Sequence, residues 1–354
     1  MTKLFSEFSI KDVKLKNRIA VPPMVIGLAE DGYVTSGNIE RYRELAKGGA
    51  GLIIQEATCV NIDGRLMEKQ LGIWKDEQIE GLKEIVNAVH EEGSKIFIQI
   101  HHAGVTSISE NPICPSAYEY KGPFRTVIGR EMTIEDIKSI QKDFIEAAAR
   151  AYKAGYDGIE LHGCHGYLIS QFLNKNVNKR TDEYGINPEK FVLEIINGIR
   201  KVTPHEFVVG IRLAGFEPAL EDGLHYAKIL DANGIDFLDV SFGFASEQIV
   251  NIAEGYKYAH TVFAAEKIKE VVAVPVFAVN SIKSPAIAEA ILNETKVDII
   301  DIGRGVLINP NWANDAKEGK DTGACLSCAK CKYFGQSQVC PGKVLFDRNK
   351  EQSS

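Results

Sequence analysis

The stretch GIELHGCHGY at residues 158–167 combines the two features on which the fold prediction depends. Gly158–Leu161 is a short, mostly apolar run, and two reactive side chains, His162 and His165, follow it closely. Seven other runs of this kind occur along the chain: Ile19–Val21, Gly51–Gln55, Lys95–Ile100, Phe207–Leu213, Phe237–Ser241, Val274–Val279 and Val297–Ile302. Short runs rich in Val and Ile, without regular polar alternation, are typical of parallel strands that are covered on both faces.

The segments between these runs have the apolar period of a helix. Residues three and four apart form one buried face in the segment with Ile134, Ile137, Ile140, Phe144 and Ala148. Thr133 with Asp136 predicts a capped start for that helix. Asn187–Pro188 and Ser284–Pro285 predict the starts of two more, since Pro is favoured at the first helical position.

Strands that alternate with helices predict right-handed crossovers and a parallel sheet. Eight such units favour closure into an α/β (β/α)8 TIM barrel. An open doubly wound sheet is the alternative, but no G-x-G-x-x-G turn follows the first strand. We expect the barrel to span residues 1–308 and a short cysteine-rich extension to span 309–354. Residues 103–132, with three prolines, form a long excursion after the third strand, expected to be a rim loop or small hairpin.

Composition narrows the range of partners and locations. Of the 354 residues 45% are hydrophobic and 25% are charged, which is ordinary for a globular protein. The net charge of −7 and the lack of a basic cluster predict no nucleic-acid partner. No run reaches the ~18 apolar residues of a membrane helix, and the first residues do not resemble a signal peptide. We therefore expect no membrane association and a cytoplasmic location.

The seven cysteines fall into two groups. Cys59, Cys114 and Cys164 are scattered, and we expect buried, reduced thiols there. The other four are crowded into the extension, as Cys325-x2-Cys328-x2-Cys331-x8-Cys340. In a cytoplasmic chain this spacing indicates a metal site rather than disulfides, and it suits either a [4Fe–4S] cluster or structural zinc.

In a parallel barrel the carboxyl ends of all strands lie on one rim, so the residues that follow each strand should share one pocket. These residues are Pro22, Pro23, Met24, Val25, Glu56, Ala57, Gln99, His101, His102, His162, His165, Tyr167, Arg212, Ser241, Asn280, Ser281, Gly303 and Arg304. The last two loops, with small residues and Arg304, are typical of phosphate binding in such barrels. Gln99 can donate to and accept from a heterocycle edge, and Arg212 can stabilise negative charge on it.

Several motifs, in order and at matching spacing, carry a resemblance to a known family. They are LKNRI (15–19), EAT (56–58), QIHHAG (99–104), HGCHGYL (162–168), QFL (171–173), NKRTDEYG (178–185) and DIGR (301–304). From about residue 4 to the extension, the chain resembles the old yellow enzyme family of NADH:flavin oxidoreductases. It is most similar to the bacterial branch that includes trimethylamine dehydrogenase and 2,4-dienoyl-CoA reductase.

The resemblance implies an FMN-dependent ene-reductase. Pro22–Val25, Ala57, Gln99 and Arg212 would contact the flavin ring, and Asn280, Ser281, Gly303 and Arg304 its phosphate. NAD(P)H would supply hydride, which passes through flavin N5 to the activated C=C of an α,β-unsaturated carbonyl substrate. His162 and His165 would donate hydrogen bonds to the carbonyl oxygen, and Tyr167 would protonate the α-carbon.

The same resemblance leaves two other functions open. The first three cysteine spacings match those of trimethylamine dehydrogenase, which favours a [4Fe–4S] cluster over zinc. The chain could then be an amine dehydrogenase or demethylase that passes electrons through the cluster. It could also be a flavin and iron–sulfur electron-transfer subunit. Both functions would need a separate electron-transfer protein; an oligomer is compatible with all three.

Some positions depart from the family pattern, and at others the sequence allows either a functional or a structural role. Val25 replaces a common Thr or Cys, and Asn280–Ser281 replaces a usual glycine pair, so the natural substrate is not predicted. The choice between NADH and NADPH is also open, because the sequence shows no nucleotide-binding fold for the reductant. We expect only one of His101 and His102 to face the pocket, the other being structural. Arg180 and Asp182 either pin their loop or contact substrate. Phe244, Tyr256 and Tyr258 either line the pocket or pack at the rim, and Glu56 has a possible structural role.

Overall fold

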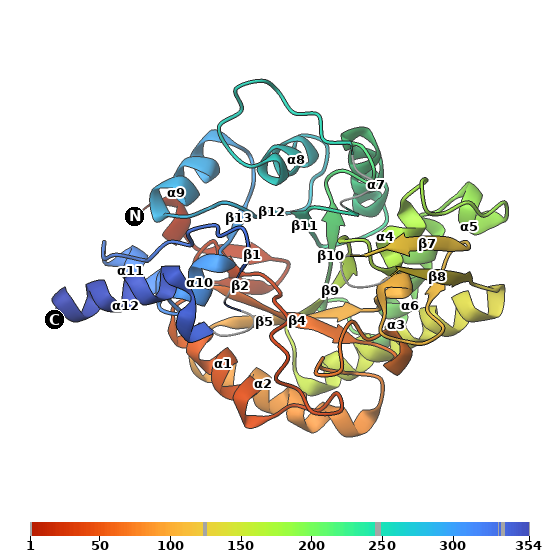
Figure 1. Cartoon of the computed structure of the whole chain (residues 1–354), viewed down its shortest axis with the longest axis horizontal. Helices are drawn as coiled ribbons and strands as arrows, with labels where there is room; N and C mark the ends of the chain where they lie inside the picture. The colour runs from red at the N-terminus through yellow and green to blue at the C-terminus, as the bar shows by residue number, and fades with distance from the viewer. Residues whose placement is uncertain (1, 123–125, 245–248, 332, 334–336, 354) are drawn as a thin grey trace.

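The computed structural model describes residues 2–122, 126–244, 249–331, 333 and 337–353. Its centre is a closed barrel of eight parallel strands, shown in Figure 1 inside a ring of helices. The strands in barrel order are β3 (Ile19–Val21), β4 (Leu52–Cys59), β5 (Lys95–His101), β9 (Gly158–Gly163), β10 (Val208–Ala214), β11 (Phe237–Ser241), β12 (Val276–Ala278) and β13 (Ile299–Asp301), and β13 pairs back with β3. All eight predicted strands are therefore present, and the TIM-barrel prediction is confirmed.

The helices cover the outer face of the strands, which explains the apolar character of the strands. In β10, for example, all seven residues are buried. The helices that follow the barrel strands are α1 (Ser36–Lys47), α2 (Ile79–Glu91), α3 (Ile134–Ala154), α4 (Leu168–Leu173), α5 (Glu183–Ile186), α6 (Lys190–Val202), α7 (Leu220–Ala232), α8 (His260–Lys269), α9 (Pro285–Glu294) and α10 (Arg304–Ile308).

Two of the three predicted helix starts are confirmed. Thr133 and Asp136 bond reciprocally at the start of α3, where the Asp136 backbone N–H donates to Thr133 Oγ1 over 3.1 Å. Ser284 caps α9, with Pro285 at its first position. The predicted cap at Asn187 is wrong, because the preceding residues already form α5, capped by Asp182, and Asn187 ends that helix. Helix α6 begins at Lys190.

The amino-terminal end of the barrel is closed by a small hairpin of β1 (Phe8–Ile10) and β2 (Val13–Leu15). Its buried Ile10 and Leu15 pack with side chains inside the barrel, which are Ala20, Leu52, Ile54, Phe97, Val208, Phe237, Phe277 and Ile299. Phe97, Phe237 and Phe277 are stacked, with ring centroids 5.5 Å and 4.8 Å apart. Apolar side chains therefore fill this end, and the polar residues lie toward the other.

The excursion after β5 forms a three-stranded sheet over the rim, which confirms the predicted hairpin. It consists of β6 (Ile113–Cys114), β7 (Tyr118–Lys121) and β8 (Thr126–Glu131), with β7 and β8 antiparallel. Arg180 fastens this sheet to the barrel, since its guanidinium donates to the carbonyls of Pro115 at 2.7 Å and Met132 at 2.6 Å and also pairs with Asp182. These bonds favour the loop-pinning role for Arg180 and Asp182.

The extension begins against the barrel and ends in a helix that projects from it, α12 (Pro341–Ser353), seen at the left of Figure 1. Trp312, in α11 (Trp312–Lys317), is wholly buried in the barrel's main core cluster. A 3-10 turn, Ser337–Val339, precedes α12. The division at residues 308 and 309 remains a prediction. In the described residues, no helix combines the length and apolar character needed to cross a bilayer.

Candidate active site

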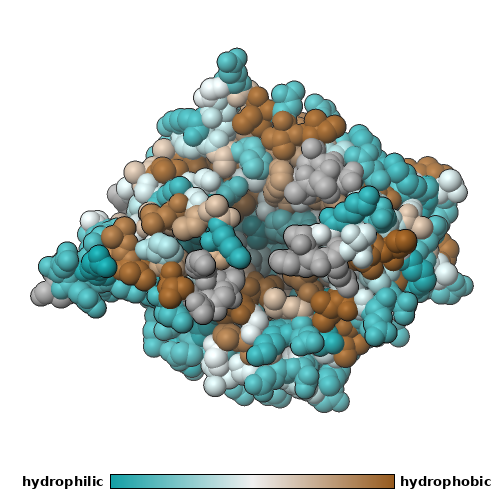
Figure 2. Space-filling view, in the orientation of Figure 1, coloured by the Kyte–Doolittle hydropathy of each residue, from teal (hydrophilic) through white to brown (hydrophobic). Residues whose placement is uncertain are grey.

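A cavity of about 400 Å3 opens at the carboxyl ends of the strands. Figure 2 shows the hollow at the centre of this face, with hydrophilic residues in its depth. The cavity is lined by ten of the residues predicted to share one pocket, which are Pro22, Pro23, Met24, His165, Arg212, Ser241, Asn280, Ser281, Gly303 and Arg304. Segments almost 300 positions apart in the sequence thus meet at one site, as the barrel prediction requires.

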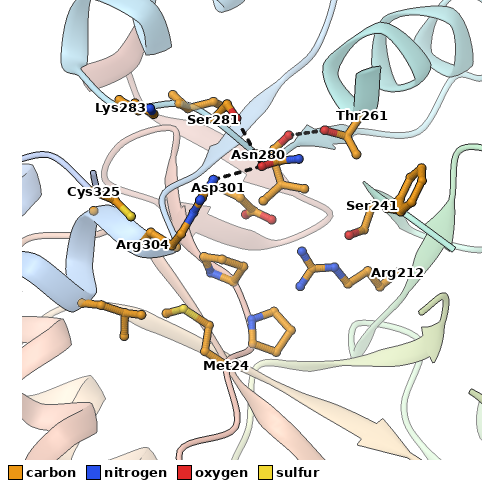
Figure 3. Close-up of a pocket in the computed structure, with 18 of the residues that line it drawn as sticks. Met24, Arg212, Ser241, Thr261, Asn280, Ser281, Lys283, Asp301, Arg304 and Cys325 are labelled. Carbon is orange, nitrogen blue, oxygen red and sulfur yellow. Dashed lines mark hydrogen bonds between the residues drawn. The ribbon is translucent and has the colours of Figure 1, made fainter. Parts of the chain in front are cut away.

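One end of the cavity is suited to an anion. Arg304 and Lys283 lie at this end, and Arg304 Nη2 donates to Asn280 Oδ1 over 3.2 Å (Figure 3). Asn280 and Ser281 have φ angles of 86° and 56°, in the left-handed region that favours glycine. Asn tolerates this region better than most residues. The loop therefore has a backbone that a glycine pair would adopt easily, although neither residue is glycine.

Arg212 lies at the other end, above a buried group of three carboxyl residues. Its Nε is 3.2 Å from Asp239 Oδ2, and Figure 3 shows its guanidinium directed into the cavity. Glu160 and Asp301 complete the group, and burial raises the pKa of Asp239 and, well above the usual range, those of Glu160 and Asp301. The positive charge of Arg212 opposes this rise in all three, and Asp239 is the carboxyl group that forms an ion pair with it.

Two of the catalytic residues predicted from the sequence, His162 and His165, lie in a hydrogen-bonded row of side chains that also includes His101 and Ser241. His101 Nδ1 is 3.0 Å from His162 Nδ1, and His162 Nε2 is 2.9 Å from His165 Nδ1. His165 Nε2 is in turn 2.8 Å from Ser241 Oγ. Desolvation, with smaller contributions from neighbouring histidines or Arg212, lowers the pKa of each of the three imidazoles. All three are therefore neutral at physiological pH.

His165 has a backbone conformation that non-glycine residues rarely adopt. Its φ is 60°, and Gly166 beside it has φ 72°. The turn brings His165 out of the barrel interior, so its side chain faces the cavity while His162 stays 94% buried. Strained residues of this kind cluster at functional sites.

Tyr167 packs its ring against this row of histidines. Its ring centroid is 4.5 Å from that of His101 and 4.6 Å from that of His162, both in edge-on geometry. Burial raises the pKa of the Tyr167 phenol above its ordinary value, so the hydroxyl keeps its proton at all physiological pH values. A protonated phenol beside neutral imidazoles can act as a proton donor.

Not every predicted residue is on the cavity wall. Val25, Ala57, Gln99, His162 and Tyr167 are absent from the lining, although all lie near the carboxyl ends of strands. The Gln99 side chain is buried, and its Nε2 donates to Glu160 Oε1 over 2.7 Å. Its amide is thus already fixed by the carboxyl group beneath the cavity.

The structure decides between the two roles that the sequence left open for several residues. His102 is buried and its Nδ1 accepts from the Gly104 backbone N–H, so it is the structural histidine, while His101 joins the row. Tyr256 and Tyr258 donate to Glu266 and Glu294, and neither tyrosine lines the cavity. These bonds favour rim packing.

Glu56 holds the turn that carries Pro22 and Met24. Its Oε2 accepts from the Ile26 backbone N–H over 3.3 Å, and the Tyr42 hydroxyl donates to its Oε1 over 3.3 Å. Burial raises the pKa of Glu56 to about 7. These contacts favour the structural role for this residue.

Sequence reasoning missed several lining residues. Phe242, Thr261, Val279, Ile282, Lys283, Asp301, Gly305 and Leu307 also line the cavity, as does Cys325, which was predicted only as a metal ligand. Asp301 and Lys283 could have been found, because they lie within three residues of predicted site residues. Thr261, in α8, gave no signal in the sequence.

The cysteines divide as predicted, with Cys59, Cys114 and Cys164 buried and free. In the extension, Cys325 and Cys340 are half-buried, and Cys328 and Cys331 are exposed. Within the described part of the chain, only His162, Cys164 and His165 bring three possible ligand atoms within 4.8 Å of one another. The extension thiols are therefore not assembled as tetrahedral zinc requires, with Zn–S bonds of about 2.3 Å.

The group at His162, Cys164 and His165 is itself poorly suited to a metal. Burial raises the pKa of the Cys164 thiol well above its ordinary value, so the thiolate that binds metals is disfavoured. The facing nitrogens of the two imidazoles already share a hydrogen bond.

Comparison with known proteins identifies the family. Residues 3–322 match the model of the NADH:flavin oxidoreductase / NADH oxidase family. An NADH oxidase from Thermoanaerobacter brockii is 39% identical over 344 residues, which cover 92% of this chain and 52% of that protein. The chain thus spans about half the length of this relative.

Solved structures give the same result. A 2-naphthoyl-CoA reductase in complex with 2-naphthoyl-CoA has a TM-score of 0.84 and 26% identity over 90% of this chain and 52% of its own. Morphinone reductase in complex with tetrahydroNAD has a TM-score of 0.78 and 26% identity, covering 91% of this chain and 92% of its own. The old yellow enzyme homologue from Zymomonas mobilis has a TM-score of 0.79 and 27% identity, covering 92% and 95%. The chain therefore belongs to the NADH:flavin oxidoreductase family, the family of old yellow enzyme.

Proposed function

We propose that the chain is an FMN-dependent oxidoreductase that transfers hydride from NAD(P)H to the activated C=C of an α,β-unsaturated carbonyl compound. The observation that carries this proposal is the cavity with cationic residues at both ends and the histidine row at its side. Family membership and the relative solved with an NAD analogue support the cofactor and the reductant.

The residues present fit FMN. Arg304 and Lys283, with the left-handed Asn280–Ser281 backbone, offer cations and polar groups to a phosphate. Pro22, Pro23 and Met24 supply an apolar surface for the ring, with Gly303 beside them. Arg212 supplies a positive charge to the polar edge of the ring. Val25, Ala57 and Gln99, the other ring contacts that the resemblance implies, do not line the cavity in this structure. A cavity of about 400 Å3 is within the range of cofactor sites.

When bound, FMN would supply the hydride-transfer chemistry that links the nicotinamide to the β-carbon of the alkene. His162 and His165, both neutral, donate N–H groups to the substrate oxygen and stabilise the charge that develops there. Tyr167 holds the proton that the α-carbon receives, and the raised pKa keeps the phenol protonated until that step.

The cysteine extension supports a second candidate function. We propose that Cys325, Cys328, Cys331 and Cys340 hold a [4Fe–4S] cluster, with zinc as the alternative metal. Cys325 lines the same cavity as Arg304 (Figure 3), which is the observation that favours this second function. A cluster held by these cysteines would supply electron-transfer chemistry, which would suit amine oxidation, or an electron-transfer subunit, with a separate partner protein.

Anaerobic purification tests both proposals. We expect a yellow protein that releases FMN on denaturation and is bleached by NADH or NADPH. Cyclohex-2-enone should restore the colour, whereas trimethylamine should not bleach the oxidised protein. A colourless protein that FMN cannot reconstitute would refute the flavin assignment. Bleaching by trimethylamine would favour the amine-oxidising function.

Two variants separate the roles within the site. Tyr167→Phe should slow re-oxidation by the enone by about 10²- to 10⁴-fold while NADH still reduces the flavin. For the extension, we expect about four iron atoms and acid-labile sulfide per chain, with iron lost in Cys325→Ser but kept in the buried-thiol control Cys114→Ser. Stoichiometric zinc would replace the cluster assignment.

A further inference from the structure

The histidine row contains more hydrogen-bonding groups than a substrate oxygen needs. Two donors suffice for that oxygen, yet His101 and Ser241 extend the row at both ends. A neutral imidazole has one N–H donor and one acceptor nitrogen, and the hydrogen bond at one nitrogen determines the role of the other. The two outer residues therefore control which nitrogens of the inner histidines can donate.

The direction of the bonds follows from the buried end of the row. His101 Nε2 is buried and has no hydrogen-bond partner among the described residues. A buried N–H without a partner is rarer than a buried acceptor without one. The proton of His101 therefore sits on Nδ1, which donates to His162 Nδ1 over 3.0 Å. His162 must then carry its proton on Nε2, the nitrogen that faces His165.

The exposed end of the row can reverse direction. Without substrate, His162 Nε2–H donates to His165 Nδ1, and His165 Nε2–H donates to Ser241 Oγ. An oxygen that accepts from both histidines replaces that contact, and His165 must then carry its proton on Nδ1. Its Nε2 becomes an acceptor. In this change the exposed His165 loses the proton on Nε2 to solvent and takes one up on Nδ1. A hydroxyl can donate as well as accept, so the Ser241 O–H then donates a hydrogen bond to His165 Nε2.

We propose that His101 and Ser241 are positioning residues: His101 fixes His162 as an Nε2–H donor, and Ser241 lets His165 change tautomer when substrate binds. Only the role of Ser241 rests on the proposed function, because His101 determines the tautomer of His162 in the protein without substrate. Neither outer residue needs to touch the substrate.

The first experiment measures the tautomers directly. The FMN-loaded protein, labelled with ¹⁵N in histidine, should give a His162 signal with an unprotonated Nδ1 and a protonated Nε2. His101→Phe keeps a planar ring but removes the donor, and the His162 signal should become a mixture of tautomers. His101→Asn, which restores an N–H near the Nδ1 position, should return it toward the wild-type state. A protonated Nδ1 in wild-type His162, or no change in His101→Phe, would overturn the proposal. Because this readout needs no turnover, it stands even if enones prove not to be substrates.

The second experiment measures the reaction with cyclohex-2-enone and NADH. His101→Phe and Ser241→Ala should each lower kcat by about 10- to 100-fold, the usual effect of losing a residue that orients a ligating or catalytic group. Ser241→Thr keeps the hydroxyl and should retain kcat within a few-fold. Equal losses in Ser241→Ala and Ser241→Thr, in proteins with wild-type melting temperatures, would overturn the role of Ser241. If wild-type protein reduces no enone, the proposed function fails and the ¹⁵N measurement alone decides the role of His101.

Discussion

Replacing the buried Glu217 with glutamine should make the protein more stable, although the substitution removes an ionisable side chain that forms hydrogen bonds. Glu217 is wholly buried in the loop between β10 and α7. Its Oε2 is 2.6 Å from Ser170 Oγ, and Asn174 Nδ2 donates to its Oε1 over 2.6 Å. Ser170 lies in α4, which begins directly after Tyr167. Glu217 thus ties the strand of Arg212 to the helix behind the histidine turn.

The size of the effect follows from the ionisation of this carboxyl group. Burial raises the pKa of Glu217 from 4.5 to about 8. Folding therefore favours the protonated form, and its contribution to stability is full below pH 4.5 and is lost as the pH rises to about 8. Each pH unit in this window costs about 1.4 kcal/mol of unfolding free energy. Between pH 4.5 and 7 the loss is about 3 kcal/mol.

Glutamine reproduces the protonated carboxyl group without its ionisation. Its Nε2 can donate to Ser170 Oγ, and its Oε1 can accept from Asn174. We expect Glu217→Gln to match the wild type near pH 4.5, to exceed it by about 3 kcal/mol at pH 7, and to exceed it by up to about 5 kcal/mol above pH 8. The difference between the two curves isolates this residue from the other titrating groups.

Urea unfolding at intervals between pH 4.5 and 9 measures this difference. The exposed Glu84, in α2, provides the matched control, and Glu84→Gln should stay within about 0.5 kcal/mol of wild type throughout. A Glu217→Gln protein that is less stable than wild type at pH 7, or whose advantage does not grow with pH, would refute the assignment of a protonated Glu217.

Three further predictions concern the cavity. Arg304→Ala should weaken FMN binding by about 10- to 100-fold, the value of a charge-assisted hydrogen bond; fluorescence titration measures it, and unchanged affinity would contradict a phosphate at this end. Gly166→Ala should lower both turnover and melting temperature, because a Cβ at this position would lie 1.8 Å from the Phe244 ring. The control is Gly319→Ala, where φ is 71° and the surrounding space is open, so that only about 1–2 kcal/mol of stability should be lost to backbone strain. Asp239→Asn should raise the midpoint potential of the flavin, because Arg212 loses the carboxylate that neutralises its positive charge. A dithionite titration that shows a lower potential would contradict this prediction.

The parts of the structure that were predictable depend on local pattern. Strands covered on both faces must be apolar, so the eight runs were visible in the sequence. The caps at Thr133 and Ser284 depend on residues no more than three positions apart along the chain, and they too were predicted correctly. The failure at Asn187 shows the limit, because a four-residue helix before it took the place of the expected loop.

The parts that were not predictable depend on the barrel's register. Adjacent histidines in a strand point to opposite sides, and the sequence could not tell which of His101 and His102 faces inward. The bond between Gln99 and Glu160 joins two strands that pair only in the closed barrel. Cys325 reaches the cavity wall through the path of the extension, which no periodicity encodes.

The small hairpin of β1 and β2 that closes the amino-terminal end of the barrel has a consequence for steady-state kinetics. Ile10 and Leu15 close the amino-terminal end of the barrel, so in the described part of the chain the cavity opens at the carboxyl ends of the strands. In the proposed reaction, the hydride donor and the hydride acceptor would enter the cavity through the same opening, so each would have to leave before the other binds. Steady-state measurements should therefore follow a ping-pong pattern, with parallel double-reciprocal lines, and a large excess of either reactant should slow the enzyme by blocking the entry of the other.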